Sequence, residues 1–400
     1  MARDVADLVV VGAGAIGGWA SWFARENGAE RVVVLERHLA GSGASSRAAG
    51  IVRAQGGIPQ TVALGRWSID FYRSQRALLG VDSGFTELGY LILAVSASDE
   101  REGRERVEMQ RAAGLDARWV DASEAAALNP TLSRAGHRGG SYVETDGFID
   151  PPRNVAAYLA AMRISGVDLR ERTAFAGLER SADRVIGVRT SNDTISTERV
   201  VLTGGPTLRA VGRLAGMRVP AGGTRHQVAV TEPHEAFEAE RLPMVFDLHA
   251  GLYWRLEDGG LLFGMSNPDE APGPARTIDW PYLEEMRRRL EGFVPATRGL
   301  GLRKVWAATI DYTPDHLPIV GPAVTADREA IGGATVASAG GHGMMWGPAV
   351  AKIAADLATA GATEVTDVAG LGLDRFDADG RSTALDPMAL PFPANLPDEE

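Results

Sequence analysis

The sequence predicts a mixed α/β fold with two intimately joined parts. An apolar run at 8–11 leads into a glycine turn and a helical run, and a second apolar run at 32–35 ends in an acid. This order of strand, glycine turn, helix, strand and acid is typical of a Rossmann βαβ unit. From about residue 219 the chain changes to short runs separated by glycine turns, which indicates antiparallel strands. A Rossmann domain interleaved with an antiparallel-sheet domain accounts for both observations.

The first βαβ unit has the spacing of a dinucleotide-binding turn. Gly12 permits the tight turn out of the strand, Gly14 lets backbone approach a pyrophosphate, and Gly17 lets the helix pack on the strand. The helix directs its free N–H groups and the positive end of its dipole at the phosphates. Glu36 follows about 20 residues later, where an acid accepts hydrogen bonds from ribose hydroxyls. The alternative is a glycine-rich turn that holds no ligand.

Composition restricts the classes of function. The chain has 400 residues, 45% of them hydrophobic, which suits a globular protein of two joined domains. Its net charge of −11 disfavours nucleic acid and anionic membranes as partners, because both need a basic face. The absence of cysteine excludes disulfides and thiolate metal sites, and we predict no metal site.

Targeting signals are not evident in the sequence. No apolar run approaches the ~20 residues that span a bilayer. Residues 1–4 run directly into the first strand and leave no room for a signal peptide. We therefore expect a cytoplasmic protein with no membrane span.

Periodicity, capping residues and turns predict the remaining elements. Helices are expected at 62–79, 99–113, 123–128, 151–163, 280–292 and 347–360. Strands are expected as a pair at 86–95 around Gly89, as a meander at 167–172, 174–180, 184–190 and 194–197, and singly at 199–202, 224–231, 244–247, 251–257, 260–265 and 303–310. The tail from about 376, rich in Pro, Asp and Ala, is expected to be an arm or a disordered end.

Four blocks of sequence together resemble the D-amino acid oxidase superfamily of FAD-dependent oxidoreductases, closest to the branch of glycine oxidase, sarcosine oxidase and dimethylglycine dehydrogenase. The blocks are the turn that ends at Glu36, 43–53, 201–205, and 313–321 with 338–343. The resemblance covers the chain from about Asp7 to Phe376. It implies a glutathione-reductase-type Rossmann FAD domain at 1–85, 145–218 and 317–375, a substrate domain at 86–144 and 219–316, and a C-terminal tail at 376–400.

The resemblance implies that FAD is held along most of the chain. The loop at 43–47 would wrap the pyrophosphate and the flavin edge, the turn at 203–205 would approach the adenosine, and the loop at 340–344 would lie by the pyrimidine end of the isoalloxazine. The predicted cofactor-binding residues are Gly12, Gly14, Ala15, Ile16, Gly17, Glu36, Arg37, Ser45, Ser46, Arg47, Thr203, Gly204, Gly205, Gly340, Gly341, His342, Gly343 and Met344. A plain turn or helix cap is the alternative for the two serines.

The resemblance also implies a reaction. A flavin accepts a hydride at N5 from a C–H next to nitrogen, so an amine or amino acid would be oxidised to an imine. N-methyl, D- and cyclic amino acids are the expected substrates. The residues expected to act on them are His342, Arg53, Tyr253, Arg255 and Trp306. His342 lies between glycines and is expected to bond flavin or substrate, with a charge tunable near neutral pH. For Trp306, as for Trp254, packing in a sheet core is the alternative.

The chain departs from the family pattern where the substrate would bind. Ile310 stands at the position where glycine oxidase and D-amino acid oxidase carry the arginine that clamps the substrate carboxylate. We expect Arg53, Arg255 or Arg303 to replace that arginine, or else a substrate that is not a simple amino acid. A surface salt bridge is the alternative for each of the three.

Three further departures bear on the flavin. Leu262 and Met345 stand where monomeric sarcosine oxidase carries lysines, one of which promotes reaction with oxygen. A dehydrogenase with another electron acceptor is therefore slightly favoured over an oxidase. Arg47 aligns with the histidine that carries covalent flavin in dimethylglycine dehydrogenase, and there is no cysteine, so we predict non-covalent FAD.

Other functions stay open. The same fold would suit a 2-hydroxy acid or polyol-phosphate dehydrogenase, although a phosphate substrate needs converging basic residues and 219–310 shows only scattered ones. The chain would also suit the flavin subunit of a multi-subunit amine dehydrogenase, or a nicotinamide-dependent Rossmann protein. The expected partners are a small amine or amino acid and either oxygen or a redox partner, and the sequence specifies no oligomeric state.

Overall fold

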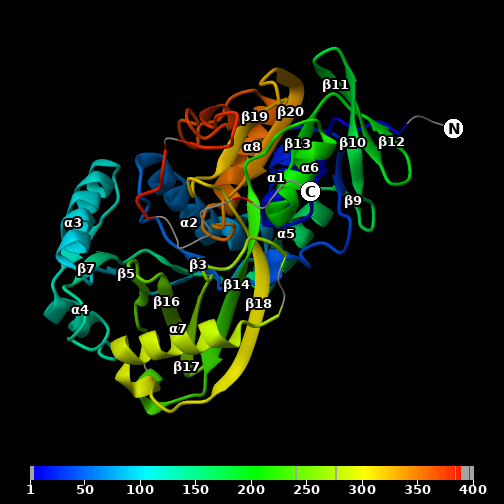
Figure 1. The fold of residues 1–400 in the computed structure, drawn as a ribbon. Coiled ribbons are helices and arrows are strands. Elements are labelled where there is room, and N and C mark those ends of the chain that lie inside the picture. The colour runs from blue at the N-terminus through cyan, green and yellow to red at the C-terminus, as the bar shows by residue number, and fades with distance from the viewer. Residues whose placement is uncertain (1–3, 239–240, 275–276, 383, 389–395, 397–400) are drawn as a thin grey trace.

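A computed structural model describes residues 4–238, 241–274, 277–382, 384–388 and 396. Its strands form two large sheets and one small sheet, and Figure 1 shows the two large sheets in separate parts of the molecule. The predicted α/β fold with an antiparallel second part is confirmed. The division of the chain at the predicted domain boundaries stays a prediction.

The first sheet has nine strands, with the order β10-β11-β20-β13-β1-β2-β9 along its main path. Its parallel centre consists of β1 (Leu8–Val11), β2 (Val32–Leu35), β9 (Asp168–Arg170), β13 (Val200–Leu202) and β20 (Ala330–Ser338). The strands β10 (Phe175–Ser181), β11 (Arg184–Thr190), β12 (Thr194–Ser196) and β19 (Ile319–Val324) complete it with antiparallel pairs.

Helices cover both faces of this sheet. On one face lie α1 (Ala15–Glu26), α2 (Pro59–Leu79), α5 (Pro151–Ile164) and α8 (Gly347–Thr359). Alternate residues of β1 point to opposite sides, so that Val10 packs with these helices and Val9 packs with Leu208 of α6 (Leu208–Leu214) on the other face. The fully buried strands of the centre therefore read as continuous apolar runs.

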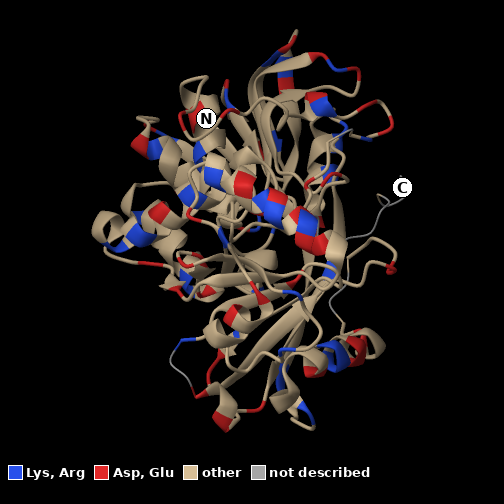
Figure 2. Cartoon of the chain, turned by 90° about the vertical axis from the view of Figure 1, so that its left-hand side faces the viewer, with Lys and Arg blue, Asp and Glu red and all other residues tan. Residues whose placement is uncertain are grey.

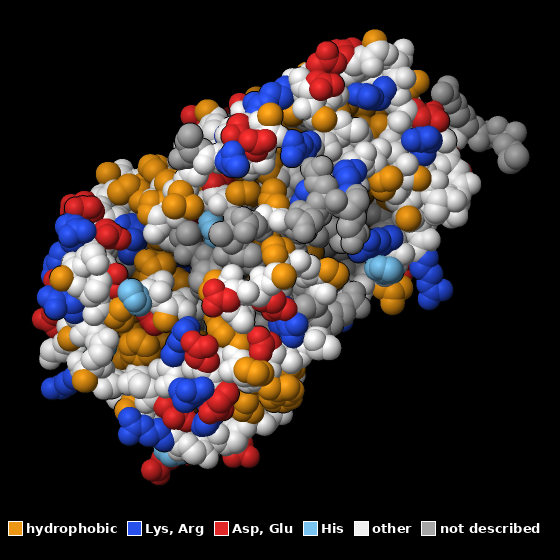
Figure 3. All heavy atoms as spheres, viewed as in Figure 1, with side chains coloured by type: hydrophobic (Ala, Val, Ile, Leu, Met, Phe, Trp, Pro, Cys, Tyr) orange, Lys and Arg blue, Asp and Glu red, His pale blue; other side chains and the backbone are white. Residues whose placement is uncertain are grey.

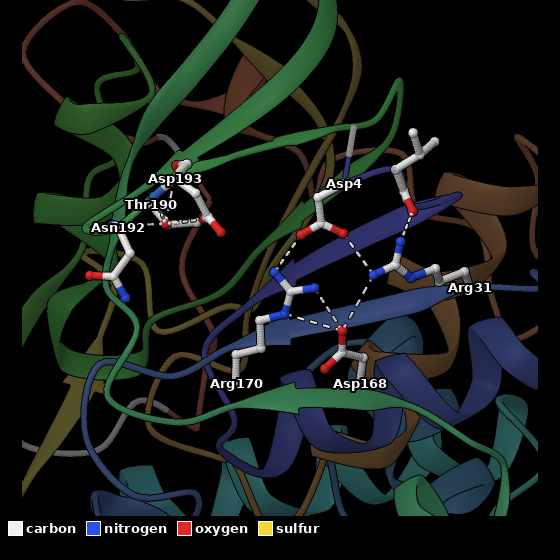
Figure 4. A network of polar contacts seen from close by, with 8 residues as sticks. Asp4, Arg31, Asp168, Arg170, Thr190, Asn192 and Asp193 are labelled. Atoms are coloured by element: carbon white, nitrogen blue, oxygen red, sulfur yellow. Dashed lines mark hydrogen bonds and ion pairs between the residues drawn. The ribbon is translucent and has the colours of Figure 1, made fainter. Parts of the chain in front are cut away.

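Charged side chains close the amino-terminal edge of the parallel strands (Figure 4). Asp4 lies between two arginines, at 2.7 Å from Arg31 Nη2 and 2.6 Å from Arg170 Nη1. Asp168 completes the network at 2.7 Å from Arg170 Nη2 and 3.6 Å from Arg31 Nη2. The two arginines hold the pKa of Asp4 below its usual value, so this edge is fixed by paired charges.

The second sheet has eight strands in the order β18-β14-β17-β16-β15-β5-β7-β6. They are β5 (Tyr90–Leu93), β6 (Arg118–Val120), β7 (Gly140–Val143), β14 (Gly222–Thr231), β15 (Met244–Asp247), β16 (Leu252–Glu257), β17 (Gly260–Met265) and β18 (Leu302–Tyr312). All pairs are antiparallel except β15 with β5. One face packs on α7 (Trp280–Phe293), where Phe293 stacks on Trp254 at 5.4 Å between ring centres.

A small sheet of β3 (Ile51–Val52), β8 (Gly147–Phe148) and β4 (Thr86–Glu87) lies apart from the two large sheets. The predicted strand pair at 86–95 is therefore wrong in its partners, because β4 pairs with β8 whereas β5 enters the second sheet. Gly89, with φ of +82°, turns the chain between them. The predicted meander is also wrong in its first strand, because β9 pairs with β2 and not with β10.

Short helices complete the fold. The side chains of Ser96 and Asp121 cap α3 (Ala97–Ala112) and α4 (Ala122–Leu128) by accepting bonds from backbone N–H groups. Single 3₁₀ turns are η1 (Ala44–Ser46), η2 (Gly205–Thr207), η3 (Glu235–Phe237), η4 (Pro295–Thr297) and η5 (Leu373–Arg375). None of the described helices combines the length and the apolar character needed to cross a membrane.

Basic and acidic residues are interspersed along both parts of the chain (Figure 2). The face in Figure 3 alternates between apolar, basic and acidic side chains. Over the described residues of that face there is no continuous basic area of the kind that nucleic acid requires.

Candidate functional site

The glycine turn after β1 has the geometry that the sequence predicted. Gly12 has φ of +93°, and a Cβ placed on Gly17 would lie 1.9 Å from Gly12 O. Gly14 precedes α1 without a side-chain cap, and Ala15 N donates to Ser45 Oγ at 2.9 Å. The first turn of α1 is therefore in contact with the loop at 43–47, and no Cβ at Gly14 separates them.

Glu36 lies directly beside this turn. Its Oε2 accepts a bond from Ala13 N at 3.0 Å, and its Oε1 accepts one from His38 N at 2.8 Å. The carboxylate thus marks the end of β2 next to the helix N-terminus, where the ribose is expected. The neighbouring Arg37 is exposed.

The strand β13 brings a second glycine turn to the same place. A Cβ on Gly12 would lie 2.7 Å from Thr203 Oγ1, and that hydroxyl donates to Val11 O. Gly205 has φ of +48°, which favours glycine, whereas Gly204 is extended at φ of 172°. The two predicted turns are therefore in contact.

The loop at 43–47 links the two large sheets. Ser45 and Ser46 lie in η1, and the exposed Arg47 donates to Gly43 O at 2.8 Å. The carbonyl oxygen of Arg47 accepts a bond from Trp306 Nε1 of β18 at 2.9 Å. Trp306 is half-buried and packs only partly in the sheet core, because its indole also reaches the loop that is predicted to wrap the cofactor.

The loop at 340–344 buries its histidine. His342 stacks on Trp346 at 4.1 Å between ring centres, and its Nδ1 lies 3.1 Å from Gly340 O. Among the described residues its Nε2 has no hydrogen-bond partner. Burial, with the nearby Arg53 and His316, lowers the pKa of His342 to about 3. The expectation of a charge tunable near neutral pH is therefore wrong, because desolvation keeps this imidazole neutral.

Met344, the last residue predicted in that loop, is buried and accepts a bond from Tyr72 OH at its carbonyl oxygen, at 2.8 Å. Gly340 and Gly341 both have positive φ, of 56° and 90°. Gly343 has open space around the position of a Cβ. The loop is thus tied to α2 with open space beside Gly343, whereas a Cβ on Gly340 would lie 3.0 Å from Leu317 O.

One face of the second sheet collects the predicted substrate residues. Directly opposed residues of antiparallel strands share a face. Gly264 opposes both Tyr253 and Val228, and Val228 opposes Trp306. Leu262 opposes Arg255 on the same side. Trp254, one residue on from Tyr253, points the other way to α7, so core packing is correct for Trp254.

Tyr253 belongs to a polar group that the sequence did not reveal. Its hydroxyl lies 2.7 Å from His226 Nε2, and His226 Nδ1 lies 3.0 Å from Ser266 Oγ. Burial lowers the pKa of His226 to about 4, so the imidazole is neutral. A Cβ on Gly264 would lie 2.6 Å from the Tyr253 hydroxyl. Only the register of β14, β16 and β17 brings these residues together, and no local motif marks them.

Arg53 is the buried cation of the site. It is 2% exposed, and in the part of the chain that the structure describes it forms no ion pair. Its Nη1 donates to Gln55 O and lies 3.5 Å from Met388 Sδ. A buried guanidinium without a carboxylate partner is costly unless a ligand supplies one.

A buried network fixes the backbone after β3, where Arg53 lies. Asp146 accepts bonds from Ala54 N at 2.7 Å and from Gln55 Nε2 at 3.2 Å. Gln55 Nε2 also donates to Tyr90 O at 2.9 Å, and its Oε1 accepts from Ser141 Oγ at 2.7 Å. Burial raises the pKa of Asp146 to about 7. This aspartate was not predicted from the sequence, where its place before Gly147 is its one signal.

The other two arginines considered for the substrate carboxylate already have partners. Arg255 is buried but pairs with Glu257 Oε2 at 2.6 Å and donates to Ala49 O from Nε and Nη2. Arg303 donates to Glu257 O at 2.6 Å and lies 3.7 Å from Asp258. Among these three arginines, Arg53 is therefore the one without an ion pair in the described chain.

The whole chain matches one protein family. The family model described as FAD dependent oxidoreductase, DAO, matches residues 7–357. The chain is 28% identical over 378 residues to 4-methylaminobutanoate oxidase (formaldehyde-forming) of Paenarthrobacter nicotinovorans, covering 92% of this chain and 45% of that protein. It is 25% identical over 319 residues to sarcosine oxidase subunit beta of Rhodobacter capsulatus, covering 78% and 76%. The chain therefore spans less than half the length of the first of these relatives.

Solved structures show the same fold. L-proline dehydrogenase from P. horikoshii has a TM-score of 0.84 at 24% identity, with 93% of this chain and 97% of that one covered. Glycine oxidase from Geobacillus kaustophilus has a TM-score of 0.80 at 24% identity, with 94% and 100% covered. The chain belongs to the DAO family of FAD-dependent oxidoreductases. The resemblance to sarcosine oxidase, dimethylglycine dehydrogenase and glycine oxidase is confirmed.

The residues of this chain fit the FAD that the family requires. A Cβ would clash at Gly12 and at Gly17, and Gly14, the residue before α1, provides no side-chain cap, although Ala15 N donates to Ser45 Oγ at 2.9 Å. Glu36 would be the acceptor for the ribose. Trp346, the residue before α8, provides no side-chain cap either, although Ser68 Oγ accepts a bond from Ala349 N at 3.3 Å. Trp346 stacks on His342, whose Nε2 has no hydrogen-bond partner in the described chain. These features suit a dinucleotide at one end and a flavin ring at the other.

Proposed function

We propose that the protein oxidises the C–N bond of an N-methyl, D- or cyclic amino acid to an imine, with non-covalent FAD as oxidant. The observation that carries this proposal is Arg53, a buried guanidinium with no carboxylate partner among the described residues. A substrate carboxylate would supply the missing anion in a charge-assisted pair. Two relatives are named for amino acids that have a carboxylate, 4-methylaminobutanoate and sarcosine.

The chain's residues divide the work of binding. Arg53 holds the carboxylate, and the network of Asp146 and Gln55 fixes the backbone next to it. In the His226 tautomer whose Nδ1–H donates to Ser266 Oγ, Nε2 accepts the hydrogen bond of the Tyr253 hydroxyl at 2.7 Å, which leaves the hydroxyl oxygen as an acceptor for the substrate N–H. Flavin, when bound, accepts the hydride from the carbon next to nitrogen. Trp306 and Leu262 supply apolar surface on the same sheet face.

The residues predicted to hold FAD keep those roles in the proposal. The Gly12–Gly17 turn, the serine loop and the turn at Thr203 would contact the pyrophosphate and adenosine, and His342 would contact the flavin through Nε2. A neutral His342 would donate or accept one bond without adding charge beside Arg53. Release of the flavin by acid or denaturant, with no yellow colour left on the protein, would support a non-covalent cofactor.

We infer that the electron acceptor is other than oxygen. Leu262 and Met345 are both buried, so neither position supplies a lysine to the flavin. Of the two buried arginines nearby, Arg255 is paired with Glu257, and Arg53 is engaged by the substrate carboxylate in the proposal. A preformed cation near the flavin favours the reaction with oxygen because it stabilises developing negative charge. Rapid peroxide formation with the best substrate would contradict this inference.

The test is an anaerobic flavin-reduction screen over N-methyl amino acids, D-amino acids, cyclic amino acids and 2-hydroxy acids. The expected result is bleaching of the flavin by amino acids and none by hydroxy acids. Bleaching by hydroxy acids alone, or purification with a nicotinamide and no flavin, would overturn the proposal.

A second candidate is the same chemistry within a multi-subunit enzyme. It is favoured by the match to sarcosine oxidase subunit beta, over 76% of that subunit. An enzyme of this kind would show bleaching by substrate but turnover only with its partner chain present. Mass analysis of the native protein purified from its own cells separates the two arrangements. A cytoplasmic location likewise remains our proposal, testable by fractionation.

A further inference from the structure

The C-terminal segment Ala384–Met388 enters the interior next to Arg53. It follows a bridge between Phe376 and Ser382, and two of its side chains are buried, Asp386 at 1% and Met388 at 0% exposure. Asp386 N donates to Asp315 O at 2.9 Å, and Asp386 Oδ1 accepts from Met388 N at 2.9 Å. The described part of the tail is thus a docked arm and not a disordered end, and residues 389–395 and 397–400 lie outside the described residues.

The segment is seated on the loop that follows Arg53. A Cβ on Gly57 would lie 1.9 Å from Asp386 Oδ1 and 2.9 Å from Pro387 Cδ, so only glycine leaves room for the segment. Met388 Sδ lies 3.5 Å from Arg53 Nη1. The tail therefore touches the same arginine that the substrate carboxylate would use.

A second buried arginine lies close by. Arg106 of α3 is 9% exposed, and four residues further along the helix Gln110 Nε2 donates to Gly56 O at 2.9 Å. This face of α3 consequently lies against the loop that seats Asp386. Both Arg53 and Arg106 interact electrostatically with Asp386, although neither lies within 4.0 Å of its carboxylate. Within the described chain, Arg106 Nε and Asp386 Oδ2 are buried without hydrogen-bond partners.

The other charges near this group are already balanced or neutral. Asp315 pairs with Arg375 at 2.7 Å, and His342 is neutral. Asp146 also interacts with Arg53, but both of its oxygens accept hydrogen bonds, from Ala54 N and Gln55 Nε2. Glu102 and Asp99 interact with Arg106 from its own helix. Of the buried carboxylates near the two arginines, Asp386 is therefore the one with an oxygen that has no hydrogen-bond partner in the described chain.

We propose that Asp386 is a specificity-determining residue that acts as an internal second carboxylate, so that the site accepts substrates with one carboxylate and rejects those with two. The inference rests on the proposed function and names its substrate class. Two buried arginines alone would suit a dicarboxylate. With Asp386 beside them, a second substrate carboxylate would be placed next to a like charge in a water-poor site, which is strongly unfavourable.

The test uses the FAD-loaded protein at mildly alkaline pH, with acetate and malonate as probes that differ by one carboxylate. Binding is measured by calorimetry and by perturbation of the flavin spectrum. The wild-type protein should prefer acetate, and Asp386→Asn should shift the ratio of the two dissociation constants at least about tenfold towards malonate. Asp379→Asn, an exposed change in the same tail, is the matched control and should leave the ratio unchanged.

Two further variants show whether the tail itself carries the effect. Truncation after Ser382 removes Asp386, and Gly57→Ala displaces it, so each should shift the ratio in the same direction. Trypsin cleavage after the exposed Arg381 reports whether the segment stays docked. An unchanged ratio in Asp386→Asn and in the truncated chain would overturn the inference, as would wild-type preference for malonate.

Failure of the proposed function gives a different pattern. If Arg53 does not bind the carboxylate, Arg53→Met keeps its affinity for acetate whatever Asp386 does. If Arg53 binds it but Asp386 has no role, Arg53→Met loses acetate and Asp386→Asn leaves the malonate ratio unchanged.

Discussion

The amino-terminal edge of the parallel sheet and the region around Arg53 differ in the burial and the ion pairing of their charged side chains. At the edge, Asp4, Arg31, Asp168 and Arg170 are all paired with one another and reach solvent (Figure 4). Around Arg53 the charges are buried and, in the described chain, no ion pair satisfies that arginine. The first arrangement stabilises a sheet. The second leaves a buried arginine without an ion pair in the described chain, which is characteristic of a site that binds an anion.

The contrast has a structural cause. An unpaired buried charge is tolerated only where the surrounding structure holds it in place. Asp146 and Gln55 supply that support through bonds to the backbone next to Arg53. The paired edge needs no such support, because water shares in solvating its side chains.

The largest effect is expected from Arg53→Met, which tests whether this arginine binds an anion. Loss of a charge-assisted partner for a buried carboxylate costs about 2–5 kcal/mol, so the rate of flavin reduction at low substrate should fall on the order of 10³-fold. Flavin content should change little, and thermal stability should change less than activity, because in the described chain Arg53 forms no ion pair within 4.0 Å and loses only its bond to Gln55 O and its longer-range interactions with Asp146 and Asp386. Rapid-mixing reduction kinetics measure the first, and thermal unfolding the second. Normal reduction by the variant would show that Arg53 does not bind substrate.

The second prediction concerns the acceptor on Tyr253. His226→Phe removes the group that takes the hydroxyl proton, so the hydroxyl is free to rotate and its oxygen is no longer fixed as an acceptor. We expect about a tenfold loss in flavin reduction, comparable to that of Tyr253→Phe, with the double variant no worse than either. Additive losses in the double variant would indicate that the two residues act separately.

The third prediction is a pH dependence of stability. The pKa of His342 falls from 6.5 to about 3 on folding, so the unfolded chain binds the extra proton first as pH decreases. The contribution of the neutral imidazole is therefore fully present above pH 6.5 and is lost progressively as pH falls towards 3. Chemical denaturation across this range should show a shallower acid loss in His342→Asn than in the parent. Equal slopes would show that the ring is not held neutral.

The smallest effect is expected at the paired edge. Arg170→Met removes two partly exposed ion pairs, and exposed pairs contribute about 0–1 kcal/mol each, so the free energy of unfolding should fall by roughly 1 kcal/mol. Flavin reduction should match the wild type. This variant is the control for Arg53→Met, since a loss of activity here would mean that the two regions are not independent.

The elements and the backbone geometry of the first glycine turn could be predicted from the sequence because local rules determine them. Glycine spacing at 12–17 and the acid at 36 follow from backbone sterics within one βαβ unit. Strand partners were predicted less well. The strands β4 and β5 are adjacent in sequence but enter different sheets, which periodicity does not encode.

Only some residues of the proposed substrate site could be predicted from the sequence. Arg53, Tyr253 and Trp306 were expected from the resemblance, yet the choice of Arg53 over Arg255 required knowledge of which arginine is already paired. His226 and Asp386 were missed because they reach the site through long-range register and tail docking. The charge of His342 was misjudged, since burial and neighbouring cations are not visible in a single loop sequence.

The bond from Trp306 to the carbonyl of Arg47 has a consequence for cofactor exchange. The loop expected to wrap FAD is tied to β18 of the other sheet by this bond of 2.9 Å. Opening of the loop would break this bond, so we expect the residence time of the cofactor to depend on how firmly Trp306 is held on the surface where the substrate would lie.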